Sequence, residues 1–213
     1  MTDSSDSFVY FAYGSSLEFD EFAAWCSQHS YTLPDLTHYQ HARLHNYVLA
    51  LNVNSKFWGG GVASIAEFPG AAVDGIAIRL PLSQLDLVRH KEGAQTGLYV
   101  EIVVTLELVA SGELVQAVTY QAAPSRVDPS VSPSVRYGNA LLKGARDRGL
   151  PAEWLSYLST LIGATITSQR EAPVTEERVR HLIMAAIPVT YLVRHAARSR
   201  DREIERSSLA LTD

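Results

Sequence analysis

Apolar and polar side chains alternate along much of the N-terminal part of the chain, which is typical of β-strands. The clearest example is residues 99–109, where aliphatic side chains at every second position from Val100 to Leu108 share one face. Pro69 and Gly70 favour a turn between two of the other strand patterns. We expect strands at residues 8–13, 42–53, 62–68, 73–80, 99–109 and 114–120.

One short helix is marked at both ends by its sequence. Ser83 is a candidate N-cap, and Asp86 lies three positions later, where an acid favours a helix start. Cations follow in the last turn, and Gly93 then ends the helix. Glu92 thus lies at the negative end of the helix dipole, where proton uptake by a carboxylate is favoured. An exposed glutamate at a helix end is the alternative interpretation.

Helical periodicity dominates the rest of the chain. Strand patterns followed by helices predict the α+β class, with a closed or strongly curved mixed sheet and helices packed around it. We expect one domain over residues 8–165 and a charged helical C-terminal extension over residues 175–213. The extension is either a dimerisation or lid element or a solvated tail, and the tail is favoured. The expected helices are residues 17–29, 83–92, 135–148, 152–162 and 175–187.

Composition narrows the class of protein. With 46% hydrophobic and 19% charged residues, the sequence is that of an ordinary globular protein. A net charge of -5 argues against a nucleic-acid partner. The N-terminus lacks a signal-peptide pattern, and the longest apolar run, near Pro188, is too short to span a membrane. The single cysteine, Cys26, fits a reducing compartment, so we expect a cytoplasmic protein.

Three histidines invite a metal interpretation that the pattern does not favour. His38, His41 and His45 would share one side of a helix, but the stretch continues into a strand pattern. No cysteine, aspartate or glutamate accompanies them at ligand spacing. We therefore expect surface or core-edge histidines and no metal site.

The strand at residues 8–13 ends abruptly in a Gly-Ser-Ser sequence. Gly14 can adopt backbone angles closed to other residues and lets a ligand approach the main chain. The amides of Gly14, Ser15, Ser16 and Leu17 can then converge on an anion such as a carboxylate. An ordinary turn is the alternative, and it is favoured when this stretch is taken alone.

Taken together and in order, several stretches resemble the γ-glutamylcyclotransferase family. The resemblance covers roughly residues 8–161, and one departure is Ser16, where the family usually has asparagine. The matching stretches are Tyr-Phe-Ala-Tyr-Gly-Ser-Ser-Leu at 10–17, Ala-Arg-Leu at 42–44, Trp-Gly-Gly-Gly-Val-Ala at 58–63, Glu-Gly at 92–93, Gly-Leu-Tyr at 97–99, Gly-Ala at 144–145 and Gly-Leu-Pro at 149–151.

The resemblance implies a fold and a set of site residues. It implies a small mixed β-barrel of about six to seven strands with flanking helices. It implies that Glu92 is the catalytic acid and base. The residues implied to bind the substrate are Tyr13, Gly14, Ser15, Ser16, Leu17, Tyr99, Tyr120 and Tyr137.

The resemblance also implies an activity. A γ-glutamyl amide would cyclise to 5-oxoproline and release an amino acid or amine, with no cofactor. The alternatives are removal of a γ-glutamyl group from a biosynthetic intermediate, and a non-catalytic module that binds γ-glutamyl ligands. Glutathione stays open as a substrate. The implied partner is a small molecule, with no nucleic acid or membrane, and a homodimer stays open.

Overall fold

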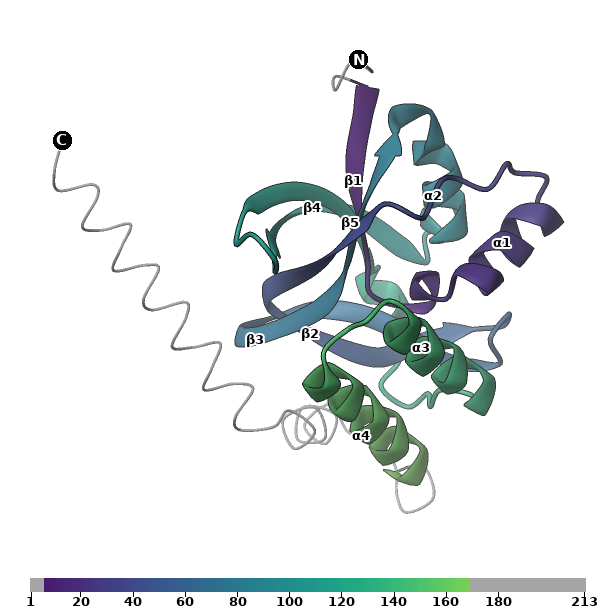
Figure 1. Ribbon diagram of the computed structural model, residues 1–213. Coiled ribbons are helices and arrows are strands. Elements are labelled where there is room, and N and C mark those ends of the chain that lie inside the picture. Colours follow the sequence, from purple (N-terminus) through teal and green to yellow (C-terminus); the bar gives the residue numbers. More distant parts are fainter. Residues whose placement is uncertain (1–5, 169–213) are drawn as a thin grey trace, which may run out of the picture.

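The computed structural model describes residues 6–168, which form a closed β-barrel flanked by helices (Figure 1). The order of strands around the barrel is β1-β3-β2-β4-β5. All neighbours are antiparallel except β1 and β5, which run parallel. The strands are β1 (Ser7–Ala12), β2 (Tyr39–Ser55), β3 (Gly60–Pro81), β4 (Tyr99–Leu108) and β5 (Leu114–Ala122).

The helices surround one part of the barrel. In Figure 1, α3 and α4 lie together below the barrel, while α1 and α2 lie on its right. The 3-10 helix η2 (Ser15–Leu17) joins β1 to α1 and contacts α3. Within residues 6–168, no helix is long and apolar enough to cross a bilayer. The helices are α1 (Phe19–Gln28), α2 (Leu85–Lys91), α3 (Val135–Asp147) and α4 (Ala152–Ser168).

The mixed barrel with flanking helices is confirmed, but the described residues contain five strands rather than six or seven. The predicted strands 62–68 and 73–80 are parts of β3, so the predicted turn at Pro69 and Gly70 is wrong. On β2, His45 pairs with Ala72 and Tyr47 pairs with Glu67, so residues 68–71 bulge opposite one residue. The turn-forming residues bend the strand without reversing it.

The predicted start of α2 is also wrong, whereas its end is confirmed. Ser83 lies inside the 3-10 helix η3 (Leu82–Gln84), and no side chain caps α2. The main-chain bond from Leu85 to Leu82 replaces such a cap. Gly93 ends the helix with a φ of 71°, in the left-handed region that suits glycine.

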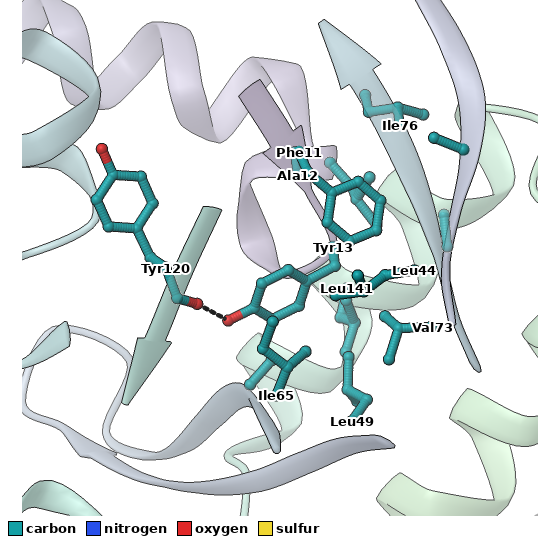
Figure 2. Close-up of a cluster of buried hydrophobic side chains, with 14 of the residues drawn as sticks. Phe11, Ala12, Tyr13, Leu44, Leu49, Ile65, Val73, Ile76, Tyr120 and Leu141 are labelled. Atoms are coloured by element: carbon teal, nitrogen blue, oxygen red, sulfur yellow. Dashed lines mark hydrogen bonds between the residues drawn. The ribbon is translucent and has the colours of Figure 1, made fainter. Parts of the chain in front are cut away.

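The barrel interior is filled by aliphatic and aromatic side chains from every strand. Phe11, Leu44, Leu49 and Ile76 are buried, and Tyr13 packs among them (Figure 2). Burying each such side chain contributes about 1.5–3 kcal/mol, so this cluster is a main source of stability. It also gives rigid support to the loop that follows β1.

The barrel closes where β1 meets β5. In the described barrel these strands pair at one position, Tyr10 with Val118. The hydroxyl of Thr119 adds a hydrogen bond of 3.0 Å to the carbonyl of Phe11.

Two of the three histidines lie on β2 beside carboxylates. His41 Nε2 is 2.9 Å from Asp74 Oδ1, and His45 Nε2 is 2.5 Å from Glu107 Oε2. His38 lies 3.8 Å from Asp35. The part of the chain that the structure describes contains no cluster of three groups suited to a metal. The predicted extension at residues 175–213 lies outside the described residues.

Candidate active site

A cavity of about 330 Å³ opens beside the loop that follows β1. Its wall brings together residues from β1, η2, α1, the turn between β2 and β3, the end of α2, β4, β5 and α3. The volume falls within the range of small-molecule sites. Eight of the nine predicted site residues line it: Tyr13, Gly14, Ser15, Ser16, Glu92, Tyr99, Tyr120 and Tyr137.

Glu92 caps the C-terminal end of α2 and is half-buried in the cavity wall. Its Oε1 accepts two hydrogen bonds of 2.6 Å, one from the hydroxyl of Tyr10 and one from that of Ser16. No hydrogen bond reaches its Oε2 within the described residues. The carboxylate is therefore fixed through one oxygen, while the other remains able to accept a proton.

The loop residue Gly14 serves the cavity in a different way from the one predicted. Its φ of -106° is negative, so the left-handed region that glycine adopts easily is not used here. A Cβ at this position would lie 3.5 Å from the Tyr137 hydroxyl and 3.6 Å from Ala63 Cβ. The glycine therefore leaves space between these two groups on the cavity wall.

The predicted cluster of loop amides is smaller than expected. The amide of Leu17 donates to the carbonyl of Gly14 at 3.1 Å, and the side chain of Leu17 is buried outside the cavity. Leu17 is thus a core residue, and its amide cannot meet a ligand. The cavity side of the loop consists of Gly14, Ser15 and Ser16.

The packing of α3 against η2 holds this loop in place. A Cβ at Gly144 of α3 would lie 2.6 Å from the amide nitrogen of Glu18 and 2.7 Å from the carbonyl carbon of Leu17. Only a residue without a side chain lets the helix come this close. Lys143, one residue earlier, adds an ion pair with Glu18.

Ala63 on β3 positions two of the tyrosines. Its amide donates a hydrogen bond of 2.8 Å to the Tyr137 hydroxyl, and its carbonyl accepts one of 2.5 Å from the Tyr99 hydroxyl. Because the Tyr137 oxygen accepts this bond, its own proton can be donated to a ligand. The start of α3 fixes Tyr137 further, since Ser134 caps that helix by accepting from the Tyr137 amide at 3.1 Å.

Two glycines shortly before Ala63 allow the start of β3 to approach the loop before α3. A Cβ at Gly60 would lie 2.5 Å from the carbonyl oxygen of Ser132, and Gly61 donates to that carbonyl at 2.7 Å. The loop before α3 therefore lies directly on the glycine-rich start of β3. The ring of Trp58 packs edge-on against Tyr137, with 5.2 Å between the ring centroids.

Tyr13 and Tyr120 have supporting contacts rather than free hydroxyls. The Tyr13 hydroxyl donates to the carbonyl of Tyr120 at 2.5 Å, as Figure 2 shows. The Tyr120 ring points the opposite way, and its hydroxyl donates to Glu101 at 3.1 Å. Arg89 binds the same carboxylate with Nε 2.7 Å from Oε2, and this bond, helped by that from Tyr120, lowers the pKa of Glu101.

The cavity tyrosines remain protonated at neutral pH. Burial is the main cause that raises the pKa of each hydroxyl, and the negative charge of Glu92 adds to it. Neutral tyrosines can act as hydrogen-bond donors beside a carboxylate. The tyrosines concerned are Tyr10, Tyr13, Tyr99, Tyr120 and Tyr137.

Sequence reasoning missed two residues that contact the centre of the site. Tyr10 stands in the resembling stretch, but its alternation within a strand gave no sign that its hydroxyl reaches Glu92. Lys91 was counted only as a cation at a helix end, yet its Nζ lies 3.2 Å from Ser16 Oγ. Both contacts join segments about eighty positions apart in sequence.

Several known proteins are similar to this chain in sequence and in fold. The γ-glutamylcyclotransferase of Bos taurus is 32% identical over 160 residues, which cover 73% of this chain and 79% of the bovine protein. The γ-glutamylcyclotransferase of Homo sapiens is 29% identical over 164 residues, with the same coverage. A solved structure described as a γ-glutamyl cyclotransferase has a TM-score of 0.62 and 26% identity, covering 84% of this chain and 99% of that one.

Residues 72–158 match the AIG2-like family, and the closed barrel has the fold of a solved γ-glutamyl cyclotransferase. The bovine relative, 32% identical and covered over 79% of its length, identifies the family more narrowly. The chain belongs to the γ-glutamylcyclotransferase family.

Proposed function

We propose that the chain is a γ-glutamylcyclotransferase that forms 5-oxoproline from a γ-glutamyl amide and releases an amino acid or amine. The observation that carries the proposal is the hydrogen bond of 2.6 Å between Ser16 and Glu92. It joins the proposed carboxylate-binding loop to the proposed base in one cavity. The names of the bovine and human relatives support the same activity.

The loop and the carboxylate hold opposite charges of the substrate. The main-chain amides of Gly14, Ser15 and Ser16 bind the α-carboxylate of the glutamyl group. Glu92 binds the α-ammonium through Oε2, the oxygen without a hydrogen bond from the described residues. The glutamyl chain then curls inside the cavity so that its nitrogen approaches its own γ-carbonyl carbon. Such preorganisation can lower the barrier by about 7–11 kcal/mol.

The proton balance needs no water and no cofactor. Glu92 takes one proton from the α-ammonium, and the freed amine attacks the γ-carbonyl carbon, forming the C–N bond of the ring. The bond between that carbon and the leaving nitrogen breaks as Glu92 protonates the nitrogen. The ring nitrogen gives up a second proton as the lactam forms, so the amine departs as an ammonium ion. Glu92 ends as the carboxylate with which it began.

Tyr137 supplies a donor for the developing oxyanion. Its oxygen already accepts a hydrogen bond from the amide of Ala63. The hydroxyl proton is therefore available to the substrate oxygen. Preorganised donors of this kind act most strongly where charge develops in the transition state.

The proposal includes the class of substrate and the cellular location of the enzyme. Its substrate is a small molecule, and we expect it to act in the cytoplasm because its one cysteine, Cys26, is a free and buried thiol. Cytoplasmic thiols persist in a reducing environment. Fractionation of cells that express the full chain tests this location.

A panel of γ-glutamyl amides tests the activity. The purified chain is incubated with γ-glutamyl amino acids, γ-glutamyl amines and glutathione, and release of 5-oxoproline is measured for each. Release from amino acid conjugates supports the main proposal, and release from amines alone favours a role in removing γ-glutamyl groups from intermediates. Ligand binding without release from any compound would instead indicate a non-catalytic binding module.

A further inference from the structure

Lys91 and Glu92 are neighbours in sequence, and both contact the hydroxyl of Ser16. The Nζ of Lys91 lies 3.2 Å from Ser16 Oγ, which in turn lies 2.6 Å from Glu92 Oε1. An ammonium group has only donors, so Ser16 accepts from Lys91 and its single proton must go to Glu92. Ser16 is only 3% exposed, so water does not compete freely for these bonds.

The ammonium group of Lys91 is held in place without a carboxylate partner among the described residues. It lies 5.0 Å from the centre of the Phe22 ring, a distance typical of a cation–π contact. Phe22 is fully buried in α1, so the contact ties the end of α2 to a rigid part of the core. The positive charge of Lys91 is therefore directed toward Ser16 and the cavity.

Other charged groups near Glu92 do not replace this cation. Tyrosines from β1, β4, β5 and α3 face it, but burial keeps them neutral. Of the remaining titratable cavity residues, Glu21 pairs with Arg136 at 3.1 Å, and His29 donates from Nδ1 to the carbonyl of Trp25 at 2.8 Å. Among the described residues, no lysine or arginine other than Lys91 lines the cavity.

We infer that Lys91 is a positioning residue for the reaction proposed above: through Ser16 it fixes Glu92 so that Oε2 receives and returns the substrate proton. The inference rests on the proposed function. With Oε1 held by Tyr10 and Ser16, proton transfer falls to Oε2, the oxygen that accepts no hydrogen bond within the described residues.

A double-mutant cycle tests whether Lys91 acts through Ser16. We expect Lys91→Met and Ser16→Ala each to lower kcat by about tenfold, with KM little changed, because each removes a charge-assisted hydrogen-bond contact. The double variant should be no slower than the slower single variant, since the two residues form one chain. Lys91→Arg should restore most of kcat, and Arg79→Met, a charge removal on exposed β3, should not alter it.

Carbon NMR gives a reading that a merely structural role would not produce. At one neutral pH, the labelled carboxylate carbon of Glu92 should change its chemical shift in Lys91→Met, because Lys91 orients that carboxylate through Ser16. In Lys91→Arg the chemical shift should return toward the wild-type value. Thermal unfolding of each variant separates these effects from loss of the fold.

Additive losses in the double variant, an unchanged chemical shift of the Glu92 carboxylate carbon in Lys91→Met, or an effect on KM alone would each overturn the inference. An effect on KM alone would indicate that Lys91 contacts the leaving group. If the wild-type chain releases 5-oxoproline from no γ-glutamyl amide, the proposed function fails by itself. The carbon NMR spectrum of Glu92 still tests the contribution of Lys91 in that event, because it requires no turnover.

Discussion

The amide of Ala63 donates a hydrogen bond of 2.8 Å to the hydroxyl of Tyr137, so a residue of β3 fixes a tyrosine of α3. The bond uses the acceptor side of the hydroxyl and leaves its proton for a ligand. The close contact between the start of β3 and the loop before α3 makes this geometry possible. Tyr137 therefore links the packing of the barrel to the chemistry of the cavity.

Replacing Tyr137 with phenylalanine should affect both stability and catalysis. The buried amide of Ala63 would lose its acceptor, so the free energy of unfolding should fall by about 1–3 kcal/mol. Loss of the oxyanion donor should lower kcat by about a hundredfold. Denaturant unfolding and steady-state kinetics measure the two effects.

Tyr157→Phe is the matched control for Tyr137→Phe. The Tyr157 hydroxyl is also buried and donates to the carbonyl of Leu49 at 3.1 Å, but the residue does not line the cavity. We expect a loss of stability with unchanged kcat. Equal kinetic losses in both variants would contradict a catalytic role for the Tyr137 hydroxyl.

Glu92→Gln should separate binding from turnover. An amide oxygen can still accept the hydrogen bonds from Tyr10 and Ser16, so the shape of the cavity should persist. Without a base, kcat should fall by at least about 10²-fold, while 5-oxoproline still binds in calorimetric titrations. Glu113→Gln, in the exposed hairpin between β4 and β5, is the control. Wild-type rates in Glu92→Gln would disprove the assignment of the base.

Gly144→Ala should displace the loop that carries Ser16. The new Cβ would meet the main chain of Leu17 and Glu18, which cannot move as a side-chain end can. We expect a stability loss of about 1–3 kcal/mol together with a higher KM, as η2 shifts from the cavity wall. In the control Gly138→Ala of the same helix, the Cβ would lie 3.0 Å from a side-chain atom, Cγ2 of Ile162, and not against the main chain of η2, so KM should not change.

Alkaline pH should unfold the protein cooperatively. Burial raises the pKa of the hydroxyls of Tyr10, Tyr13, Tyr99 and Tyr137 above the ordinary value of 10.0. Below pH 10 both folded and unfolded states hold these protons, so the contribution to stability is complete. As pH rises through and beyond this value, the unfolded state releases protons that the folded state retains, and stability falls. Circular dichroism and tyrosinate absorbance, followed together, should change in one transition.

Local signals in the sequence predicted most of the barrel and the place of its acid. Period-two alternation located β4, and the cations followed by Gly93 located the end of α2. Glu92 could therefore be placed at a helix end before its surroundings were known. These signals depend on neighbouring residues, which is why they were sufficient.

Contacts between distant segments could not be predicted in this way. Pro69 and Gly70 have turn chemistry, but pairing of β3 with β2 on both sides of them keeps the strand continuous. The amide of Leu17 looked available until the 3-10 turn joined it to Gly14. The contact of Lys91 with Ser16 depends on how α2 packs against α1, and no local pattern encodes it.

The short pairing of β1 with β5 has a consequence for the thermal inactivation of the enzyme. Tyr10 both pairs with Val118 at this join and donates its hydroxyl to Glu92. Separation of the two strands and release of the acid are therefore one local event, which needs far less energy than unfolding of the whole chain. We expect thermal inactivation to begin while the helices are still intact, with amide exchange near Val118 rising in step with the loss of activity.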